Sequence, residues 1–556
     1  MPVSSQQGKN GVLSVKNKSY PLNRVESIRN LRELVDIAAE KYGDKHAITF
    51  KRKDKMIHIS YRQIKSDTDA LGTALYDMGI HNGTIAVIGE NSYEWILTYF
   101  ATVNSGNVIV PLDKELTTTE IRNLVMDSGA EVLIHSDEFK SVANCMNKEE
   151  SHIRYFVNMN NLEDMIKKGR RLIEQGDNRI TGFKVNNHAM TAILYTSGTT
   201  GLAKGVMLSH LNIARNAAAA CQNVEVIGNN ILVLPLHHTF SFTAGVCSTI
   251  LVGSEIYINS SLKNILADIA TSKPHSMCLV PLFVETFYKR IWDGAKQHSK
   301  DELLRRLIRI SNILLRVRID LRRVFFKSVL RAFGGDLELI VCGGAPLESK
   351  YIQGLRDFGI NVVNGYGITE CSPIVSVNRN FYYRDGSTGP VLPGCEVKIV
   401  EPDEDNQGEI YVKGDIVMMG YYRNEQATKE AFDGEWMKTG DIGYMDADGF
   451  LFITGRKKNL IVLSNGKNVY PEEVENTLLR HIPYIKETVV SAEGNTIVAE
   501  VFLDTELYPD SVSHVDNDVF ALNRRLPSYM TIGRTVIRNE EFPKTSIKKI
   551  KRNYNG

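Results

Sequence analysis

The chain of 556 residues lacks the marks of secreted, membrane-spanning and nucleic-acid-binding proteins. Its seven cysteines are scattered without a CxxC pair, which argues against a disulfide or zinc framework and predicts reduced, mostly buried thiols. The first twenty residues contain no signal-peptide core, and no apolar run reaches transmembrane length. Because 66 Lys and Arg are balanced by 65 Asp and Glu, no net field would draw the protein onto nucleic acid. We expect a cytoplasmic protein, either free or peripheral to a membrane, with no nucleic-acid partner.

The chain is too long for a single hydrophobic core, so at least two domains are expected. An amphipathic helix is predicted at 31–43, and strand, helix and strand follow over 84–112. Further apolar strands lead into small polar loops, at 131–136, 155–159, 191–197, 229–236, 338–344 and 360–367. This alternation predicts an α/β fold of wound sheets with ligand loops at the carboxyl ends of the strands.

The pattern changes near residue 388. Short alternating strands such as CEVKIV, GEIYVKG and GFLFITG, separated by Gly and Asp turns, predict a small β-rich subdomain over about 388–455. The chain that follows is about the size of a separate small α/β lid. We therefore predict an N-terminal domain over 1–455, a hinge at 456–458 and a mobile C-terminal domain over 459–556.

A basic segment stands apart at 301–333, with nine Lys or Arg residues against three acidic ones. Its apolar residues fall near helical spacing. A basic amphipathic helical pair can lie on an anionic membrane surface. The alternative is a surface helical hairpin that turns its apolar face into the core, and the sequence leaves both open.

The stretch YTSGTTGLAKGV, at 195–206, has the composition of a phosphate cradle. Glycines let successive backbone N–H groups point at one anion, and hydroxyls and a lysine add donors. A Walker A loop is excluded because no Ser or Thr follows the lysine. The residues predicted to bind phosphate are Thr196, Ser197, Gly198, Thr199, Thr200, Gly201 and Lys204.

This loop resembles the phosphate loop of adenylate-forming enzymes, which comprise acyl-CoA synthetases, luciferases and peptide-synthetase adenylation domains. Further stretches resemble that family's motifs in the family's order, so the resemblance spans most of the chain. They are LPLHHTFS (234–241), GGAPLE (343–348), NGYGITECSP (364–373), GEIYVKG (408–414), KTGDIGYMDADGFLFITGRKKNLI (438–461) and PKTSIKKIKR (543–552).

The resemblance implies a role for each matched residue. The adenine site would be built from Gly343, Gly344, Ala345, Asn364, Gly365, Tyr366 and Gly367. Asp441 and Arg456 would hold the ribose, Thr369 would contact the α-phosphate, and Glu370 would coordinate Mg²⁺. Asp446 and Asp448 are expected to be turn acids.

Four further positions, two lysines, a glycine and a histidine, complete the implied machinery. Lys549 is the expected catalytic lysine, although Lys548 stands where the family usually has glycine. Lys458 occupies the hinge position, and Gly466 would either line a pantetheine tunnel or be a plain turn glycine. His238, in the acyl-pocket motif, would be a gate or a packed imidazole.

The substrate is expected to be a medium- to long-chain fatty acid. The stretch SMCLVPLFV at 276–284 is a candidate apolar wall, and the insertion at 285–335 is similar to that of long-chain fatty acyl-CoA synthetases. ATP, Mg²⁺ and coenzyme A are the implied cofactors. The alternatives are a fatty acyl-AMP ligase, an acyl carrier protein ligase, and a non-catalytic nucleotide- or lipid-binding protein.

Overall fold

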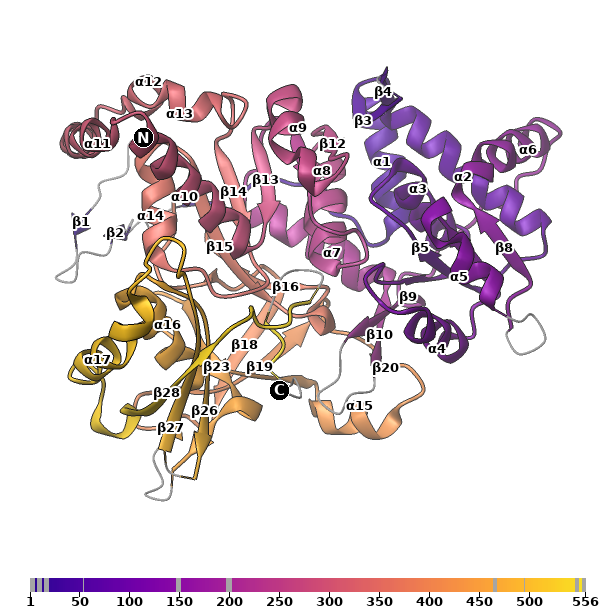
Figure 1. Ribbon diagram of the computed structural model, residues 1–556. Helices are drawn as coiled ribbons and strands as arrows, with labels where there is room; N and C mark the ends of the chain where they lie inside the picture. Colours follow the sequence, from indigo (N-terminus) through magenta and orange to yellow (C-terminus); the bar gives the residue numbers. More distant parts are fainter. Residues whose placement is uncertain are drawn as a thin grey trace.

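The computed structural model describes residues 20–53, 55–146, 152–196, 203–463, 468–494, 496–545 and 550–552, with the backbone of strands β1 (Gln6–Gln7) and β2 (Leu13–Ser14). Within these residues, two large sheets lie side by side, and the β-rich and C-terminal parts adjoin one end of them (Figure 1). The predicted α/β class is confirmed.

The first large sheet has a mostly parallel interior, and the two strands that flank the predicted phosphate loop in sequence lie near one edge of it. Its seven described strands are, in spatial order, β20 (Gly420–Tyr421), β10 (Lys204–Ser209), β9 (Met190–Thr196), β6 (Val108–Pro111), β5 (Thr84–Ile88), β7 (Val132–His135) and β8 (Tyr155–Asn158). Strands β9 and β10 form an antiparallel hairpin, so the loop at 197–203 joins two strands.

The second large sheet carries the predicted adenine loops. Its eight described strands are, in spatial order, β16 (Ile374–Val377), β15 (Asn361–Gly367), β14 (Leu339–Cys342), β13 (Ser276–Leu279), β11 (Asn230–Leu232), β12 (Ile256–Ile258), β3 (His46–Arg52) and β4 (Lys55–Ser60). The six strands from β15 to β3 run parallel, and antiparallel β16 and β4 form the two edges. Parallel strands buried on both faces explain the continuous apolar runs in the sequence.

Helices fill the space between the sheets and cover their outer faces. The inner helices are α1 (Leu31–Tyr42), α2 (Tyr61–Asp77), α3 (Tyr93–Asn104), α7 (His210–Asn223) and α8 (Ser248–Leu251), whose buried side chains share one core with strands of both sheets. On the first sheet's far side lie α4 (Thr118–Ser128) and α5 (Lys140–Cys145), and α6 (Leu162–Glu174) packs on α2. On the second sheet's far side lie α9 (Ile265–Ser272), α10 (Pro281–Gln297), α11 (Asp301–Arg316), α12 (Arg322–Phe325), α13 (Lys327–Arg331) and α14 (Ser349–Asp357).

The β-rich part begins at Gly389. Its described strands are β17 (Gly389–Pro390), β18 (Cys395–Val400), β19 (Gly408–Gly414), β21 (Phe432–Asp433), β22 (Trp436–Met445) and β23 (Phe450–Arg456), and α15 (Glu425–Ala431) precedes β21. Beyond it come β24 (Ile461–Val462), β25 (Asn468–Val469), α16 (Pro471–His481), β26 (Ile485–Glu493), β27 (Thr496–Leu503), α17 (Ser511–Asn523) and β28 (Ile532–Arg538). The last three strands and both helices share their own core.

The basic segment differs from the predicted helical pair. It contains one long helix, α11, followed by the two short helices α12 and α13. The helix ends because Arg318 adopts a left-handed φ of 66° and the N–H of Ile319 returns to the carbonyl of Leu314, which closes the last turn. One stripe of α11, which includes Leu304, packs into the core; Leu303, Ile310 and Ile313 stay exposed.

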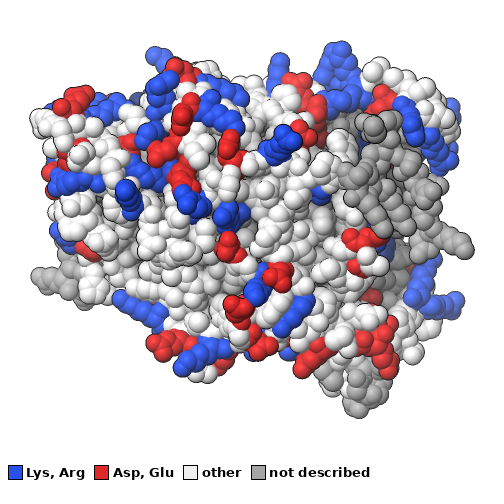
Figure 2. All heavy atoms as spheres, turned by 180° about the vertical axis from the view of Figure 1, so that it is seen from behind, with Lys and Arg blue, Asp and Glu red and all other residues white. Residues whose placement is uncertain are grey.

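The cysteines agree with the sequence prediction. All seven are free; four are buried, Cys278 and Cys395 are intermediate, and Cys145 is exposed. In the described part of the chain, no helix is long and apolar enough to cross a bilayer. Lys and Arg are interspersed with Asp and Glu over the face shown in Figure 2, as expected from the balanced composition.

Candidate active site

Three loops meet at the carboxyl ends of parallel strands in the second sheet. Strands β14 and β15 are neighbours, with Cys342 paired to Asn364, and each runs directly into a predicted adenine-binding stretch. A β-carbon placed on Gly343 would lie 3.5 Å from the Phe240 ring and 3.6 Å from the carbonyl oxygen of Gly365. The structure therefore brings the acyl-pocket motif and both adenine motifs together.

Two glycines in these loops are required by the backbone. Gly344 has a φ of 88°, which L side chains rarely adopt. A β-carbon on Gly367 would lie 2.1 Å from the carbonyl oxygen of Pro373. The turn from Gly367 to Pro373 can therefore close only around a residue without a side chain, and this turn carries Thr369 and Glu370.

The side chain of Asn364 is prepared for a ligand. It is 8% exposed, and its Oδ1 atom has no hydrogen-bond partner among the described residues. A buried amide oxygen that accepts no hydrogen bond destabilises the folded protein, unless a bound ligand supplies the donor. An exocyclic amine such as the one on adenine would supply the missing donor. Ala345 follows Gly344 in the adjacent loop and is half-buried.

Asp441 is the centre of a buried network that joins two sheets. Its carboxylate accepts a hydrogen bond from Tyr366 Oη at 2.6 Å and pairs with Arg456 Nε at 2.9 Å. Asp441 and Arg456 are cross-strand partners on β22 and β23, while Tyr366 comes from β15. Burial, followed by the Asp441 charge, holds the pKa of Tyr366 well above its usual range, so the phenol remains a donor.

Glu370 is held by groups from outside its own motif. Its Oε1 atom accepts a hydrogen bond from Tyr421 Oη at 3.0 Å, and its backbone carbonyl accepts one from the N–H of Met418 at 2.8 Å. Lys204 Nζ lies 5.0 Å from the centroid of the Tyr421 ring. Tyr421 thus links the predicted metal ligand to the lysine of the phosphate loop.

The phosphate loop itself is described only at its ends. Thr196 and Lys204 are paired across the β9–β10 hairpin, and Thr196 Oγ1 donates to the Lys204 carbonyl at 3.5 Å. The other predicted phosphate ligands lie outside the described residues, namely Ser197, Gly198, Thr199, Thr200 and Gly201.

A histidine pair lines the predicted acyl pocket. His237 Nε2 lies 3.4 Å from Asp113 Oδ2, and the rings of His237 and His238 are 4.2 Å apart. Burial, followed by the neighbouring His237, lowers the pKa of His238 to about 3, so His238 is neutral at ordinary pH. A side chain that stays neutral at every pH well above 3 is poorly suited to general acid–base catalysis near neutral pH.

A small apolar cavity, with a volume of about 10 Å³, is lined in part by His237. Its walls come from α3, the strands of the first sheet and the segment after β11, and include Tyr99, Leu194, Leu236 and Phe242. The stretch at 276–284 lies elsewhere, in β13 and the start of α10. The Tyr99 and Phe242 rings stack with centroids 3.7 Å apart, so an aromatic pair closes this part of the cavity.

The C-terminal part of the chain approaches this site from two directions. Lys458 is the second residue after β23, and burial, then the Arg456 charge, lowers its pKa. Near the end of the chain, Lys544 pairs with Ile550, and Arg552 forms ion pairs with Glu472 and Glu475 of α16. Lys549 and Gly466 lie outside the described residues.

The sequence analysis missed Tyr421 and Asp113. Both contact predicted residues only because of sheet pairing: β20 aligns Tyr421 with Val206 next to the phosphate loop, and β6 ends just before Asp113. The expectation that Asp446 and Asp448 are turn acids agrees with the structure, where both pair with Arg384 away from the Asp441 network.

Comparison with known proteins gives one consistent result. Residues 35–422 match the family model described as AMP-binding enzyme, and residues 458–554 match the model of the AMP-binding enzyme C-terminal domain. The chain is 30% identical to the long-chain-fatty-acid–CoA ligase FadD15 of Mycobacterium bovis, over 79% of this chain and 76% of the relative. It is 29% identical to the human long-chain-fatty-acid–CoA ligase ACSBG1, over 86% of this chain and 71% of the relative.

The fold is also shared with a solved structure. The anthranilate CoA ligase AuaEII, determined in complex with anthranoyl-AMP, superposes with a TM-score of 0.76 over 95% of this chain and 96% of that one. Its sequence is 20% identical, so this likeness supports the fold alone.

Proposed function

This chain belongs to the AMP-binding enzyme family, and on that premise we propose that it is a fatty acid–CoA ligase that forms AMP. It activates a fatty acid to acyl-AMP with ATP, releases pyrophosphate, and then transfers the acyl group to coenzyme A. The residue assignments rest on two features: the Asp441 carboxylate held by Tyr366 and Arg456, and the buried, unpaired Oδ1 atom of Asn364.

The first step needs a carboxylate and a polyphosphate to meet, although both are negative. An oxygen of the fatty acid bonds to the α-phosphorus of ATP while the bond to the bridging oxygen of pyrophosphate breaks. Asn364 would accept from the adenine amine, and Asp441 would accept from the ribose hydroxyls. These contacts position ATP without touching the reacting atoms.

Charge at the phosphates would be met by groups from two parts of the chain, the turn that carries Thr369 and Glu370 and the start of β10 with the loop before it. Thr369 would contact the α-phosphate, and Lys204 with the loop that precedes it would hold the outer phosphates. Glu370 fits a magnesium ligand, because Tyr421 occupies only one of its carboxylate oxygens and Mg²⁺ prefers oxygen donors. Mg²⁺ bound there would neutralise phosphate charge.

Lys549 would supply the remaining cation. The chain that flanks it is positioned between domains: Arg552 is anchored to α16, and Lys551 lies close enough to α4 to help lower the pKa of Glu120, after the larger effect of the Thr117 hydrogen bonds. This placement supports a lysine that reaches the α-phosphate from the C-terminal domain during adenylation.

The second step requires a rearrangement of the same residues. The thiol of coenzyme A loses its proton, its sulfur bonds to the acyl carbon, and the bond from that carbon to AMP breaks. We assign the hinge to 456–458, which joins an N-terminal domain over 1–455 to a C-terminal domain over 459–556. Lys458 would be the pivot, and Gly466 would leave room for the pantetheine arm.

The acyl chain would enter beside His238 and the cavity next to His237. That cavity has a volume of about 10 Å³, room for roughly one water molecule, so it cannot hold an acyl chain in this conformation. A long chain therefore requires the Tyr99–Phe242 stack to open. His238, being neutral, would act as a packed gate residue rather than as a proton carrier.

Contact with a membrane surface is proposed for α11. The exposed apolar stripe contains Leu303 (54% exposed), Ile310 (48%) and Ile313 (61%), and Val317 extends it at 63%. Among the described residues, Arg309, Arg316 and Arg318 are exposed and have no ion-pair partner, so their charge is available to anionic lipid. Apolar side chains flanked by cations suit the interface of an anionic bilayer.

Membrane contact can be tested with charge-reversal variants, and the structure shows which arginines to change. Arg322 pairs with Asp320 and Arg323 binds backbone carbonyls, so both are unsuitable. Reversing Arg309, Arg316 and Arg318 to Glu should abolish sedimentation with phosphatidylglycerol vesicles, whereas reversing exposed Arg524 and Arg525 should not. Equal sedimentation of both variants and wild type would contradict membrane contact.

Product analysis tests the proposed function and separates it from its alternatives. The protein, ATP, Mg²⁺ and fatty acids of graded chain length should give acyl-CoA and AMP when coenzyme A is supplied. Acyl-AMP that accumulates with coenzyme A present would indicate an acyl-AMP ligase, and transfer only to acyl carrier protein would indicate the carrier-protein ligase. Nucleotide binding without turnover would indicate a non-catalytic protein.

A further inference from the structure

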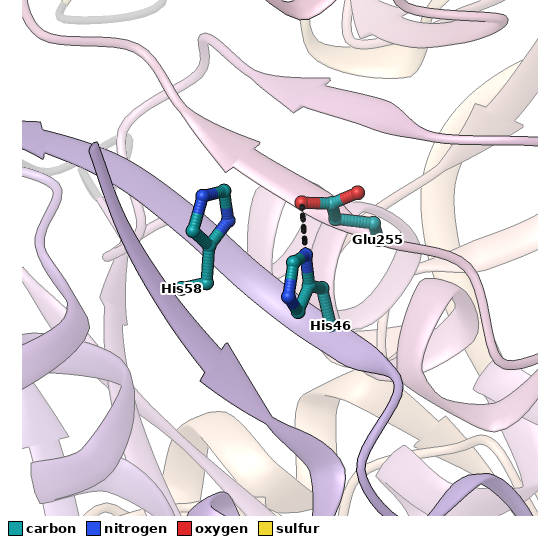
Figure 3. A group of neighbouring side chains, drawn as sticks. All are labelled: His46, His58 and Glu255. Atoms are coloured by element: carbon teal, nitrogen blue, oxygen red, sulfur yellow. Dashed lines mark ion pairs between the residues drawn. The ribbon is translucent and has the colours of Figure 1, made fainter.

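Two histidines and a glutamate gather at the far edge of the second large sheet. His46 opens β3, His58 lies on the edge strand β4, and Glu255 directly precedes β12 (Figure 3). One ligand atom from each lies within 4.8 Å of the other two. The cluster stands at the amino ends of β3 and β12, whereas the adenine loops follow the carboxyl ends of β14 and β15.

We propose that His46, His58 and Glu255 bind a divalent first-row transition metal of the Zn²⁺ type. Two imidazoles with one carboxylate suit such an ion, whereas Mg²⁺ is bound through oxygen atoms. The site is thus chemically distinct from the one that Glu370 would provide.

The hydrogen bonds of Thr49 prepare one of the imidazoles. The Thr49 hydroxyl donates to Glu255 Oε1, so it can only accept from His58 Nδ1, which lies 2.8 Å away. His58 therefore carries its proton on Nδ1, and the lone pair available to a metal is on Nε2, on the side of the ring away from Thr49. Metal-binding histidines are commonly oriented in this way, by a hydrogen bond from the other ring nitrogen. Thr49 is 5% exposed, and its position is fixed by packing.

The remaining geometry requires the His46 ring to turn. His46 Nδ1 lies 4.0 Å from Glu255 Oε1, and the two imidazole rings are stacked with centroids 4.2 Å apart. Tetrahedral coordination with bonds of about 2.0–2.1 Å places ligand atoms roughly 3.3 Å apart. The lone pairs of nearly parallel rings do not converge on one ion, so the His46 side chain, which is 52% exposed, has to turn out of the stack to bind with His58. Solvent would complete the coordination.

The consequence is a cross-link between strands that are far apart in sequence. The metal would tie the edge strand β4 and strand β3 to β12, which lies about 200 residues later. It would stabilise this edge without entering the reaction.

The test uses the full-length protein after treatment with a chelator. Titration with Co²⁺, followed by visible absorption, should show one tetrahedral site, and Zn²⁺ should displace the Co²⁺ and raise the melting temperature. His58→Ala should remove the absorption and the shift. Thr49→Val should keep the stoichiometry but weaken affinity by about 10- to 100-fold, with the melting temperature of the metal-free protein little changed.

The matched control is His298→Ala, which removes an exposed histidine on a different element and should bind as wild type does. The proposal is overturned if wild type shows no tetrahedral Co²⁺ spectrum. It is also overturned if the spectrum survives in the His46→Ala/His58→Ala double variant, which would place the ion at another group such as Asp113 with His237 and His238.

Discussion

Replacing Asp441 with Asn tests how the structure holds the ribose of ATP. A carboxylate offers about four lone-pair sites. Tyr366 and Arg456 take two of them, which leaves two for the two ribose hydroxyls. An amide offers one oxygen, and its NH₂ group would face the Tyr366 or Arg456 donors. Because Asp441 is 2% exposed, no water can readily replace the lost acceptor.

The expected effect follows from this loss. A hydrogen bond to a charged group contributes roughly 1.5–3 kcal/mol, so weakening two of them should cost about 2–4 kcal/mol. At about 1.4 kcal/mol per factor of ten, kcat/KM for ATP should fall about 30- to 1,000-fold. ATP–pyrophosphate exchange at varied ATP measures this directly, and a melting curve checks that the variant is folded.

Asp448→Asn is the control, since Asp448 lies in the turn of the same hairpin and pairs with Arg384. It should retain the wild-type KM for ATP. A folded Asp441→Asn variant whose KM for ATP is unchanged would refute the ribose assignment.

Three further results are expected. Lys549→Ala should lower acyl-AMP formation about 10²- to 10³-fold and spare thioester formation from supplied acyl-AMP, whereas Lys548→Ala should spare both; equal loss of both half-reactions would contradict the role. Tyr421→Phe should lower kcat about tenfold and raise the Mg²⁺ concentration that gives half-maximal activity. An unchanged Mg²⁺ dependence would show that Tyr421 does not affect metal binding. The pKa of His238 is about 3 in the folded protein against about 6.5 unfolded, so its stabilising contribution is present above pH 6.5 and falls as the pH drops. His238→Phe should therefore reduce the loss of unfolding free energy between pH 7 and pH 5 by about 2 kcal/mol; a urea-melt difference near zero would show that His238 is not buried and neutral.

The parts that sequence could predict are those encoded in contiguous residues. Apolar runs that end in glycine loops identified β5, β9, β14 and β15, because a parallel strand buried on both faces has that local signature. The adenine residues were predicted from the resemblance of two of these stretches to the family's motifs, and their role stays a prediction. Gly367 is needed where it stands because a side chain would strike the Pro373 carbonyl.

The parts that sequence could not predict depend on which strands become neighbours. Tyr421 contacts Glu370 because β20 pairs with β10, and nothing in the local sequence specifies that pairing. The same holds for His58 and Glu255, which meet at Thr49 across three strands. The basic segment shows a different limit: its periodicity predicted helix, but the spacing alone did not reveal that α11 carries a buried stripe and an exposed one.

Adenylation of a fatty acid is the reaction on which the residue roles above depend. The most direct measurement is acid-dependent exchange of labelled pyrophosphate into ATP, run with fatty, aromatic and amino acids side by side. The account predicts exchange with medium- or long-chain fatty acids that is lost in Lys549→Ala. Exchange supported only by an aromatic or amino acid, or no exchange with any acid, would contradict it.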